Sequence, residues 1–299
     1  MKEAYLYKNL SDRKIQCRNC AHYCLIKSNE RGICGVRENR EGKLFSLVYA
    51  KLAAVNIDPI EKKPFFHFLP GSFSLSIATA GCNFVCKNCQ NWDISQEPKP
   101  DKPIFSSYEL PPEEIVKMAL KNKTPSISYT YVEPTIFLEY ALDTMQLAKK
   151  AGLKNVWVTN GFLSPEAFDL IAPYLDAANV DLKGFSDEFY QKICGGKLKP
   201  VLETLKRMKK KKIWVEVTTL VIPTLNDDEK TFKNIANFIK KELGPETPWH
   251  VTQFSGAISW QLRDLPDTPV ETLKRAYEIG KKAGLKYVHI GNVPGLNTE

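Results

Sequence analysis

The sequence has no hydrophobic run long enough to cross a bilayer, and residues 1–10 carry charges where a signal peptide would need an apolar core. We therefore expect a cytoplasmic protein without a membrane partner. There is also no internal repeat and no low-complexity tract, which excludes a repeat architecture. The 299 residues, 43% hydrophobic and 25% charged, are typical of a globular protein with one large domain and a small appendage.

The net charge of +8 comes with lysine-rich stretches such as residues 209–212. Stretches of this kind are usually a solvated surface, and they are common in heat-adapted proteins. A partner with negative charge, such as nucleic acid or an acidic protein surface, is the alternative. Charge by itself names no partner.

The eight cysteines are grouped rather than scattered. Four lie within residues 17–34, three within residues 82–89, and Cys194 stands alone. In a reducing cytoplasm, tight groups of cysteines indicate metal binding rather than disulfide bonds. Cys194 is either a small buried residue or a thiol at the rim of the active site that handles substrate.

Strand-like and helix-like segments alternate from residue 73 onward. The expected strands are residues 74–79, 127–131, 156–159, 178–181, 213–219, 250–254 and 287–290. The expected helices are residues 112–121, 135–150, 200–210, 229–243 and 269–283, with shorter helical segments capped by Ser164 and Ser186 and with Asn226 or Asp227 as the cap of residues 229–243. Residues 99–112 are expected to form an exposed connection.

This alternation predicts βα units around a parallel sheet, and six or seven units suit a complete or partial α/β barrel. The chemistry of such barrels lies at the carboxyl ends of the strands. We expect residues 51–299 to form the barrel and residues 1–50 to form a small cysteine-rich module.

The loop after the first expected strand contains Cys82, Cys86 and Cys89 in the pattern C-x3-C-x2-C. Each thiolate can bind one iron of a [4Fe-4S] cubane, which leaves the fourth iron open to substrate. The alternative is a zinc knuckle with His67 or Cys194 as a distant fourth ligand. The short spacing and the strand–loop context favour the cluster.

This loop resembles the signature of the radical S-adenosylmethionine (SAM) superfamily, although Asn88 stands where an aromatic residue is usual. The resemblance implies further SAM-binding residues at the ends of later strands. It implies that Glu133 contacts the amino group of SAM and that Lys183 pairs with its carboxylate. It also assigns to SAM binding Thr159, Asn160, Asp181 and His250. Val158 replaces an acid that related activating enzymes carry, which argues against a bound cation there.

The N-terminal group consists of Cys17, Cys20, Cys24 and Cys34. Four thiolates at short spacing close a tetrahedral Zn²⁺ site or hold a second Fe–S cluster. Spacing does not separate the two, although we lean slightly toward zinc. His22 is a substitute for one ligand. Full coordination predicts a structural or electron-relaying site.

The whole chain resembles the AmmeMemoRadiSam-system group of radical SAM enzymes, which is similar to pyruvate formate-lyase activating enzymes. The motifs that carry this resemblance are residues 34–37, 58–64, 82–92, 131–135 and 291–295. It implies a partial (β/α)6 barrel that cleaves SAM reductively to a 5′-deoxyadenosyl radical, with electrons from a reduced ferredoxin or flavodoxin. Three functions stay open: activation of a glycyl radical protein, radical modification of RNA or a small molecule, and a non-enzymatic zinc protein that binds nucleic acid.

Overall fold

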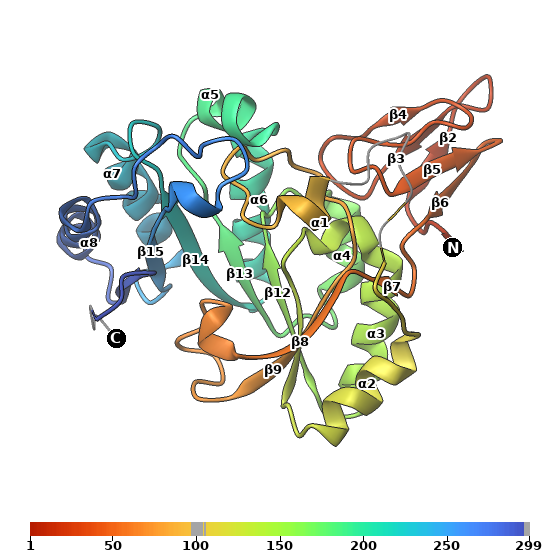
Figure 1. Cartoon of the computed structure of the whole chain (residues 1–299), viewed down its shortest axis with the longest axis horizontal. Coiled ribbons are helices and arrows are strands. Elements are labelled where there is room, and N and C mark those ends of the chain that lie inside the picture. The colour runs from red at the N-terminus through yellow and green to blue at the C-terminus, as the bar shows by residue number, and fades with distance from the viewer. Residues whose placement is uncertain (97–103, 105, 296–299) are drawn as a thin grey trace.

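The computed structural model describes residues 1–96, 104 and 106–295, and its centre is an eight-stranded sheet. Seven strands run parallel, in the spatial order β16-β15-β14-β13-β12-β11-β9. They are β9 (Phe73–Ala78), β11 (Ser126–Tyr129), β12 (Lys154–Thr159), β13 (Ala177–Asp181), β14 (Trp214–Val221), β15 (Trp249–Gln253) and β16 (Val288–Gly291). Because β16 ends the sheet on one side and does not pair with the other edge, the curved sheet is a partial barrel (Figure 1).

All seven predicted parallel strands are present, but the sequence pattern missed the eighth strand of this sheet. Strand β8 (Ala54–Pro59) runs antiparallel to β9 and forms the other edge. Its residues alternate irregularly between half-buried and exposed positions, which is typical of an edge strand.

The helices lie on the outer face of the sheet and bury their apolar stripes against it (Figure 1). They are α2 (Pro112–Lys121), α3 (Leu138–Lys150), α4 (Pro165–Ile171), α6 (Leu198–Lys210), α7 (Glu229–Phe238) and α8 (Val270–Ala283). The short α5 (Asp187–Phe189) lies instead in the connection between β13 and α6. Two predicted helices are subdivided: Pro134–Phe137 forms a 3-10 turn before α3, and Ile239–Leu243 continues α7 as a π-helical turn.

The predicted caps are partly correct. Ser164 and Ser186 accept hydrogen bonds from the first turns of their helices. The cap of α7 is Asp228 rather than Asn226 or Asp227. Asn226 instead donates to the carbonyl oxygens of Lys183 and Leu220. It therefore connects the segment after β13 with the end of β14.

The first fifty residues form two small antiparallel sheets of their own. One contains β1 (Lys2–Glu3), β6 (Lys43–Ser46) and β5 (Arg37–Arg40), and the other contains β2 (Tyr7–Asn9), β3 (Ile15–Cys17) and β4 (Leu25–Ile26). A separate small core of Ala4, Ile15, Cys17, Ile26 and Leu44 lies between them. Figure 1 shows these sheets beside α3 and α4 at one end of the barrel.

Three shorter elements follow in the chain around the cysteine loop. Helix α1 (Trp92–Gln96) follows that loop, and β7 (Lys51–Leu52) pairs with β10 (Tyr108–Glu109). Of the predicted connection over residues 99–112, positions 99–103 and 105 lie outside the described residues, and the remainder contains β10 and the first residue of α2. Within the described part of the chain, every helix is too short or too polar to span a bilayer.

Candidate active site

The loop with the three cysteines begins directly after β9 at Gly81. The φ angle of Gly81 is +97°, a conformation that side chains rarely adopt, and a Cβ there would stand 2.8 Å from the Cys34 carbonyl oxygen. The amides of Val85 and Lys87 donate to the carbonyl oxygens of Cys194 and Ile193 at 2.9 Å each. The loop is therefore held between the N-terminal sheets and the segment that follows α5.

The thiols of Cys82, Cys86 and Cys89 lie close enough together that each would feel the charge of the others. Burial raises the pKa of Cys82 and Cys89, whereas a hydrogen bond to the Cys194 thiol, followed by burial, raises the pKa of Cys86. Buried thiols of this kind become thiolates only when a cation compensates the charge, as iron does in a cluster. The donor set therefore fits an Fe–S cluster with three protein ligands.

Among the described residues, no three His, Cys, Asp or Glu side chains are placed so that they could hold a single metal ion. In a cubane, each thiolate binds a different iron, so the sulfurs need not converge on one point.

The two distant residues considered as a fourth ligand have different positions. His67 lies near the amino ends of the strands, where its Nε2 is 2.9 Å from Nε2 of His289. Cys194 is a free, fully buried cysteine whose thiol is hydrogen-bonded to that of Cys86, so it does not line an open rim. The structure thus places one additional thiol beside the trio.

We expect Cys194→Ala to retain the full iron content of the wild type, because the trio is expected to supply all the protein ligands. Iron analysis and the visible absorption of the anaerobically reconstituted variant measure this. Loss of most of the iron would instead identify Cys194 as a fourth ligand and the site as a closed one.

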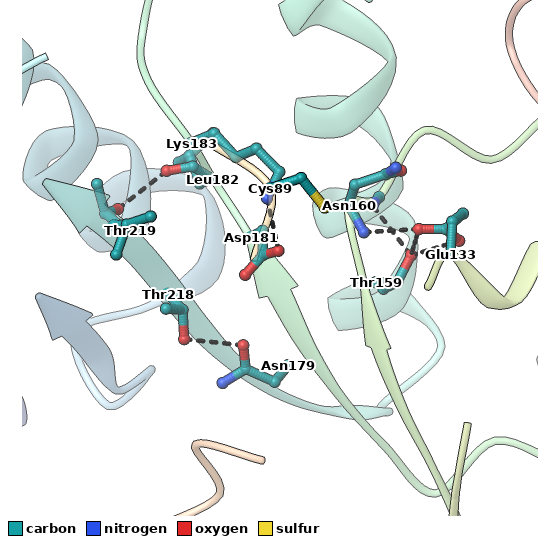
Figure 2. Close-up of polar contacts among 12 residues, drawn as sticks. Cys89, Glu133, Thr159, Asn160, Asn179, Asp181, Leu182, Lys183, Thr218 and Thr219 are labelled. Atoms are coloured by element: carbon teal, nitrogen blue, oxygen red, sulfur yellow. Dashed lines mark hydrogen bonds and ion pairs between the residues drawn. The ribbon is translucent and has the colours of Figure 1, made fainter. Parts of the chain in front are cut away.

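The end of β13 brings a charged pair to the same place. Lys183 Nζ lies 2.7 Å from Asp181 Oδ2, and both side chains are partly buried. Burial alone would lower the pKa of Lys183, but the charges of Asp181 and of the Cys86 and Cys194 thiols outweigh it and hold the pKa well above its ordinary value. Figure 2 shows this pair facing Cys89. A permanent positive charge next to the cysteine trio suits an anionic ligand.

Glu133 joins the ends of β11 and β12. Its two carboxylate oxygens accept hydrogen bonds from the amide and hydroxyl of Thr135, from the hydroxyl of Thr159 at 2.8 and 2.9 Å, and from the amide of Asn160 at 2.7 Å (Figure 2). Burial raises the pKa of Glu133, and these donors oppose that shift. A carboxylate has about four lone-pair directions, so no acceptor is left for an ammonium group in this arrangement.

Asn160 connects this network to the cysteine loop. Its Nδ2 donates to Asn83 Oδ1 at 2.7 Å, and Asn83 directly follows Cys82. Sequence reasoning missed Asn83, because an asparagine between two ligands carries no signal of its own. The structure thus brings together the trio, Asp181, Lys183, Glu133, Thr159 and Asn160.

His250 is not part of this assembly. It is the second residue of β15, and its Nε2 lies 2.7 Å from Oε2 of the fully buried Glu216 near the start of β14. The same carboxylate accepts hydrogen bonds from the amides of Phe66 and His67. His250 therefore belongs to the packed layer near the amino ends of the strands. The contact of His250 with SAM stays a prediction, and its neighbours in the structure are not the residues assigned to SAM.

The four N-terminal cysteines line one cavity together with His22, Arg37 and Asn83. His22 Nε2 is 2.8 Å from the Asn83 carbonyl oxygen. The histidine considered as a metal ligand thus contacts the loop with Cys82, Cys86 and Cys89 instead. Sequence reasoning also missed Arg37, which forms a buried ion pair with Glu139. The sequence signal that could have identified Arg37 is the motif of residues 34–37, which begins at Cys34 and ends at Arg37.

Comparisons with known proteins identify the family of this chain. An uncharacterized protein of Methanocaldococcus jannaschii is 47% identical over 299 residues, covering 100% of this chain and 87% of that protein. The pyruvate formate-lyase-activating enzyme of Clostridium pasteurianum is 23% identical over 209 residues, covering 65% of this chain and 84% of that enzyme.

A radical SAM methyltransferase from Sphaerobacter thermophilus shares the fold, with a TM-score of 0.55 and 13% identity over 73% of this chain and 66% of that chain. The model of the radical SAM superfamily matches residues 76–239, from β9 through α7, and includes the cysteine trio. The chain therefore belongs to the radical SAM superfamily and is an enzyme.

Proposed function

We propose that this enzyme cleaves SAM reductively at a [4Fe-4S] cluster held by Cys82, Cys86 and Cys89, and that the 5′-deoxyadenosyl radical abstracts a hydrogen atom from its substrate. The observation that supports this best is the gathering of three thiols, one buried and two half-buried, in one loop at the carboxyl end of β9. When bound, the cluster supplies the electron and an open iron. The protein supplies ligands, orientation and the exclusion of water.

The direct test is an anaerobically reconstituted and dithionite-reduced sample incubated with SAM. We expect 5′-deoxyadenosine and methionine in chromatography. Their absence from a sample with a full iron complement would contradict the proposal.

We assign Lys183 to the carboxylate of SAM. Asp181 holds the ammonium group of Lys183 in place. The Glu133 network has a different task, because its oxygens are already occupied by the protein. We assign Glu133 to positioning Thr159 and Asn160, and through Asn160 the loop beside Cys82. The side chains of Lys183, Thr159 and Asn160 are in this way held in position before SAM binds.

We expect Lys183→Met to raise KM for SAM by about 10- to 100-fold, because a charge-assisted hydrogen bond contributes roughly 1.5–3 kcal/mol. Initial rates of 5′-deoxyadenosine formation at varied SAM concentration measure this. Lys192→Met is the matched control, since Lys192 pairs with Glu188 at the exposed surface. Equal KM values for both variants would remove Lys183 from the SAM site.

For the substrate, we favour a protein that receives a glycyl radical, because a pyruvate formate-lyase-activating enzyme is a relative over 65% of the chain. The test combines the reduced enzyme, SAM and a candidate protein with a glycine-containing radical loop, and looks for a glycyl radical by electron paramagnetic resonance. An RNA substrate would instead show binding that weakens steeply with salt. The third sequence-based hypothesis, a non-enzymatic zinc protein, is wrong because the chain belongs to an enzyme superfamily.

We also propose that residues 1–50 form a separate metal-binding module attached to the barrel of residues 51–299. Their sheets share no strand with the barrel, and they have their own small core.

A further inference from the structure

We propose that Tyr131 is a positioning residue of the SAM site: Asp58 and Lys63 anchor its phenol, and the phenol holds the strained backbone turn at the end of β11. This turn leads to Glu133. The inference rests on the proposed function for the identity of the ligand. The motif of residues 58–64 contains Asp58 and Lys63, and neither residue has a role in the proposed contacts to the cluster or to SAM.

Tyr131 has a backbone conformation that a tyrosine rarely adopts. Its φ angle is +64°, in the left-handed region that favours glycine. The amide of Val132 donates to the carbonyl oxygen of Thr130 at 2.8 Å, so these three residues form a γ-turn of the rare form with a positive central φ. Strained residues of this kind persist only where the surrounding structure holds them, and they cluster at functional sites. Contacts of Tyr131 itself must therefore offset the strain.

The phenol of Tyr131 is held from several sides. Its hydroxyl donates to Asp58 Oδ2 and accepts a hydrogen bond from Asn56 Nδ2 at 3.2 Å. The Lys63 ammonium lies 4.2 Å from the centre of the ring, within cation–π distance, and 2.6 Å from the same Oδ2 of Asp58. Asp58 and Lys63 are both buried. The ring and the hydroxyl of Tyr131 are thus fixed by one buried ion pair.

Charge makes this anchor strong. Burial, followed by the hydrogen bond to Asp58, raises the pKa of Tyr131 to about 12, so the phenol stays protonated and can donate. Burial alone would raise the pKa of Asp58, but the hydrogen bonds from its donors outweigh burial and lower that pKa. The carboxylate is therefore ionised. A hydrogen bond to an ionised acceptor is roughly twice as strong as one between neutral groups.

Strand β8, which the sequence pattern missed, supplies two of these contacts. Asn56 and Asp58 are two residues apart in it, so their side chains lie on the same face of the sheet. They stand opposite Ser76 and Ser74 of β9, the strand that leads into the cysteine loop. The edge strand thereby connects the motif of residues 58–64 with the turn at the end of β11.

The turn also connects the anchor with both ends of the cysteine loop. The Tyr131 carbonyl oxygen accepts a hydrogen bond of 2.9 Å from Asn91 Nδ2, just beyond the third cysteine. Glu133 follows the turn by two residues, and its hydrogen bond to the Asn160 amide leads to Asn83 beside the first cysteine. A change in the turn would therefore move the cysteine loop and the Glu133 network together.

The first test compares the dissociation constants of labelled SAM, measured anaerobically by filtration with reconstituted, unreduced protein. We expect Tyr131→Phe to weaken binding by about 5- to 20-fold, because it removes a hydrogen bond to a charged acceptor. Tyr140→Phe is the matched control, since this hydroxyl on α3 donates to the Leu110 carbonyl oxygen at 2.8 Å. It should leave SAM binding unchanged. Equal dissociation constants in Tyr131→Phe and the wild type would overturn the proposal, as would an equal loss in both variants.

A second comparison separates the backbone of Tyr131 from its side chain. Glycine adopts a φ of +64° without strain, whereas alanine does not, and both lack the anchor. We expect Tyr131→Ala to bind SAM more weakly than Tyr131→Gly by about fivefold or more. Equal binding by these two variants would show that Tyr131 does not act through the turn.

The turn can also be observed directly, without SAM. Hydrogen exchange of the peptide of residues 130–136 in the reconstituted protein should be about tenfold faster in Tyr131→Phe and unchanged in Tyr140→Phe. Weakened SAM binding with unchanged exchange would mean that the phenol acts on SAM itself, which contradicts a positioning role.

The anchor is tested with the double variant Asp58→Asn and Lys63→Met, which removes the ion pair without leaving a buried charge unpaired. It should lose as much SAM affinity as Tyr131→Phe, and affinity equal to the wild type would remove the ion pair from the proposal. A wild type that binds SAM without cleaving it would contradict only the proposed function, because these comparisons use binding. A wild type that binds no SAM would contradict both.

Discussion

Replacing Cys82, Cys86 or Cys89 singly with alanine should abolish the formation of 5′-deoxyadenosine. Each substitution removes one of three ligands from a cluster that has no spare protein ligand in the loop. Because enzymes accelerate their reactions by about 10⁶-fold or more, we expect a loss of at least about 10³-fold in the rate of SAM cleavage. Product chromatography under reducing, anaerobic conditions measures it.

The control for these variants is the proposed N-terminal metal site, whose metal content should be the same in all three as in the wild type. An alanine variant that still cleaved SAM at more than a few per cent of the wild-type rate would show that another group replaces the missing thiolate. Cys194 would then be the first residue to examine, because its thiol is hydrogen-bonded to the Cys86 thiol.

Replacing Glu139 with alanine should destabilise the folded protein by about 3–5 kcal/mol, since it leaves the buried charge of Arg37 without its partner. The two side chains are 0% and 2% exposed, and they join helix α3 of the barrel to strand β5 of the N-terminal sheets. Tyr5 also donates its amide to Glu139. The free energy of unfolding from denaturant titrations measures the loss.

An exposed pair offers the matched control. Glu229→Ala removes the partner of Lys233, whose side chain is 59% exposed, and should cost about 0.5 kcal/mol or less. The double variant Arg37→Met with Glu139→Leu should regain most of the stability lost in Glu139→Ala, because no unpaired charge stays buried. If Glu139→Ala and Glu229→Ala were equally stable, the buried pair would not hold the two parts together.

Much of the barrel could be predicted from local pattern. All seven parallel strands and the bounds of α2 follow from segments whose periodicity and turn residues agree with their final environment. Strand β8 could not be predicted in this way, because an antiparallel edge strand depends on a partner rather than on its own periodicity. The cap of α7 was misplaced by one or two residues, since Asn226, Asp227 and Asp228 all suit that position locally.

In the candidate site, too, some residues could be recognised from the local sequence, whereas their contacts depend on folding. The cysteine trio was recognisable because three ligands of one centre lie within eight residues, and Asp181 and Lys183 because they follow one strand. Glu133 was recognised as a site residue, but its hydrogen bonds to Thr159 and Asn160 join two strand ends and appear only after folding. His250 shows the converse, since its position in the sequence suggested a ligand and the packed barrel places it beside Glu216.

The sequence by itself pointed to the chemistry that we propose: three closely spaced thiols for a cluster, four more for a metal-binding module, and the alternating pattern of a barrel. Such features are local, because ligand spacing and periodicity are written in neighbouring residues. Only the tertiary structure decided that the two cysteine groups meet, through Gly81, Asn83 and His22. More than forty residues separate Cys34 from Cys82, and contacts over that distance arise from the packing of whole elements.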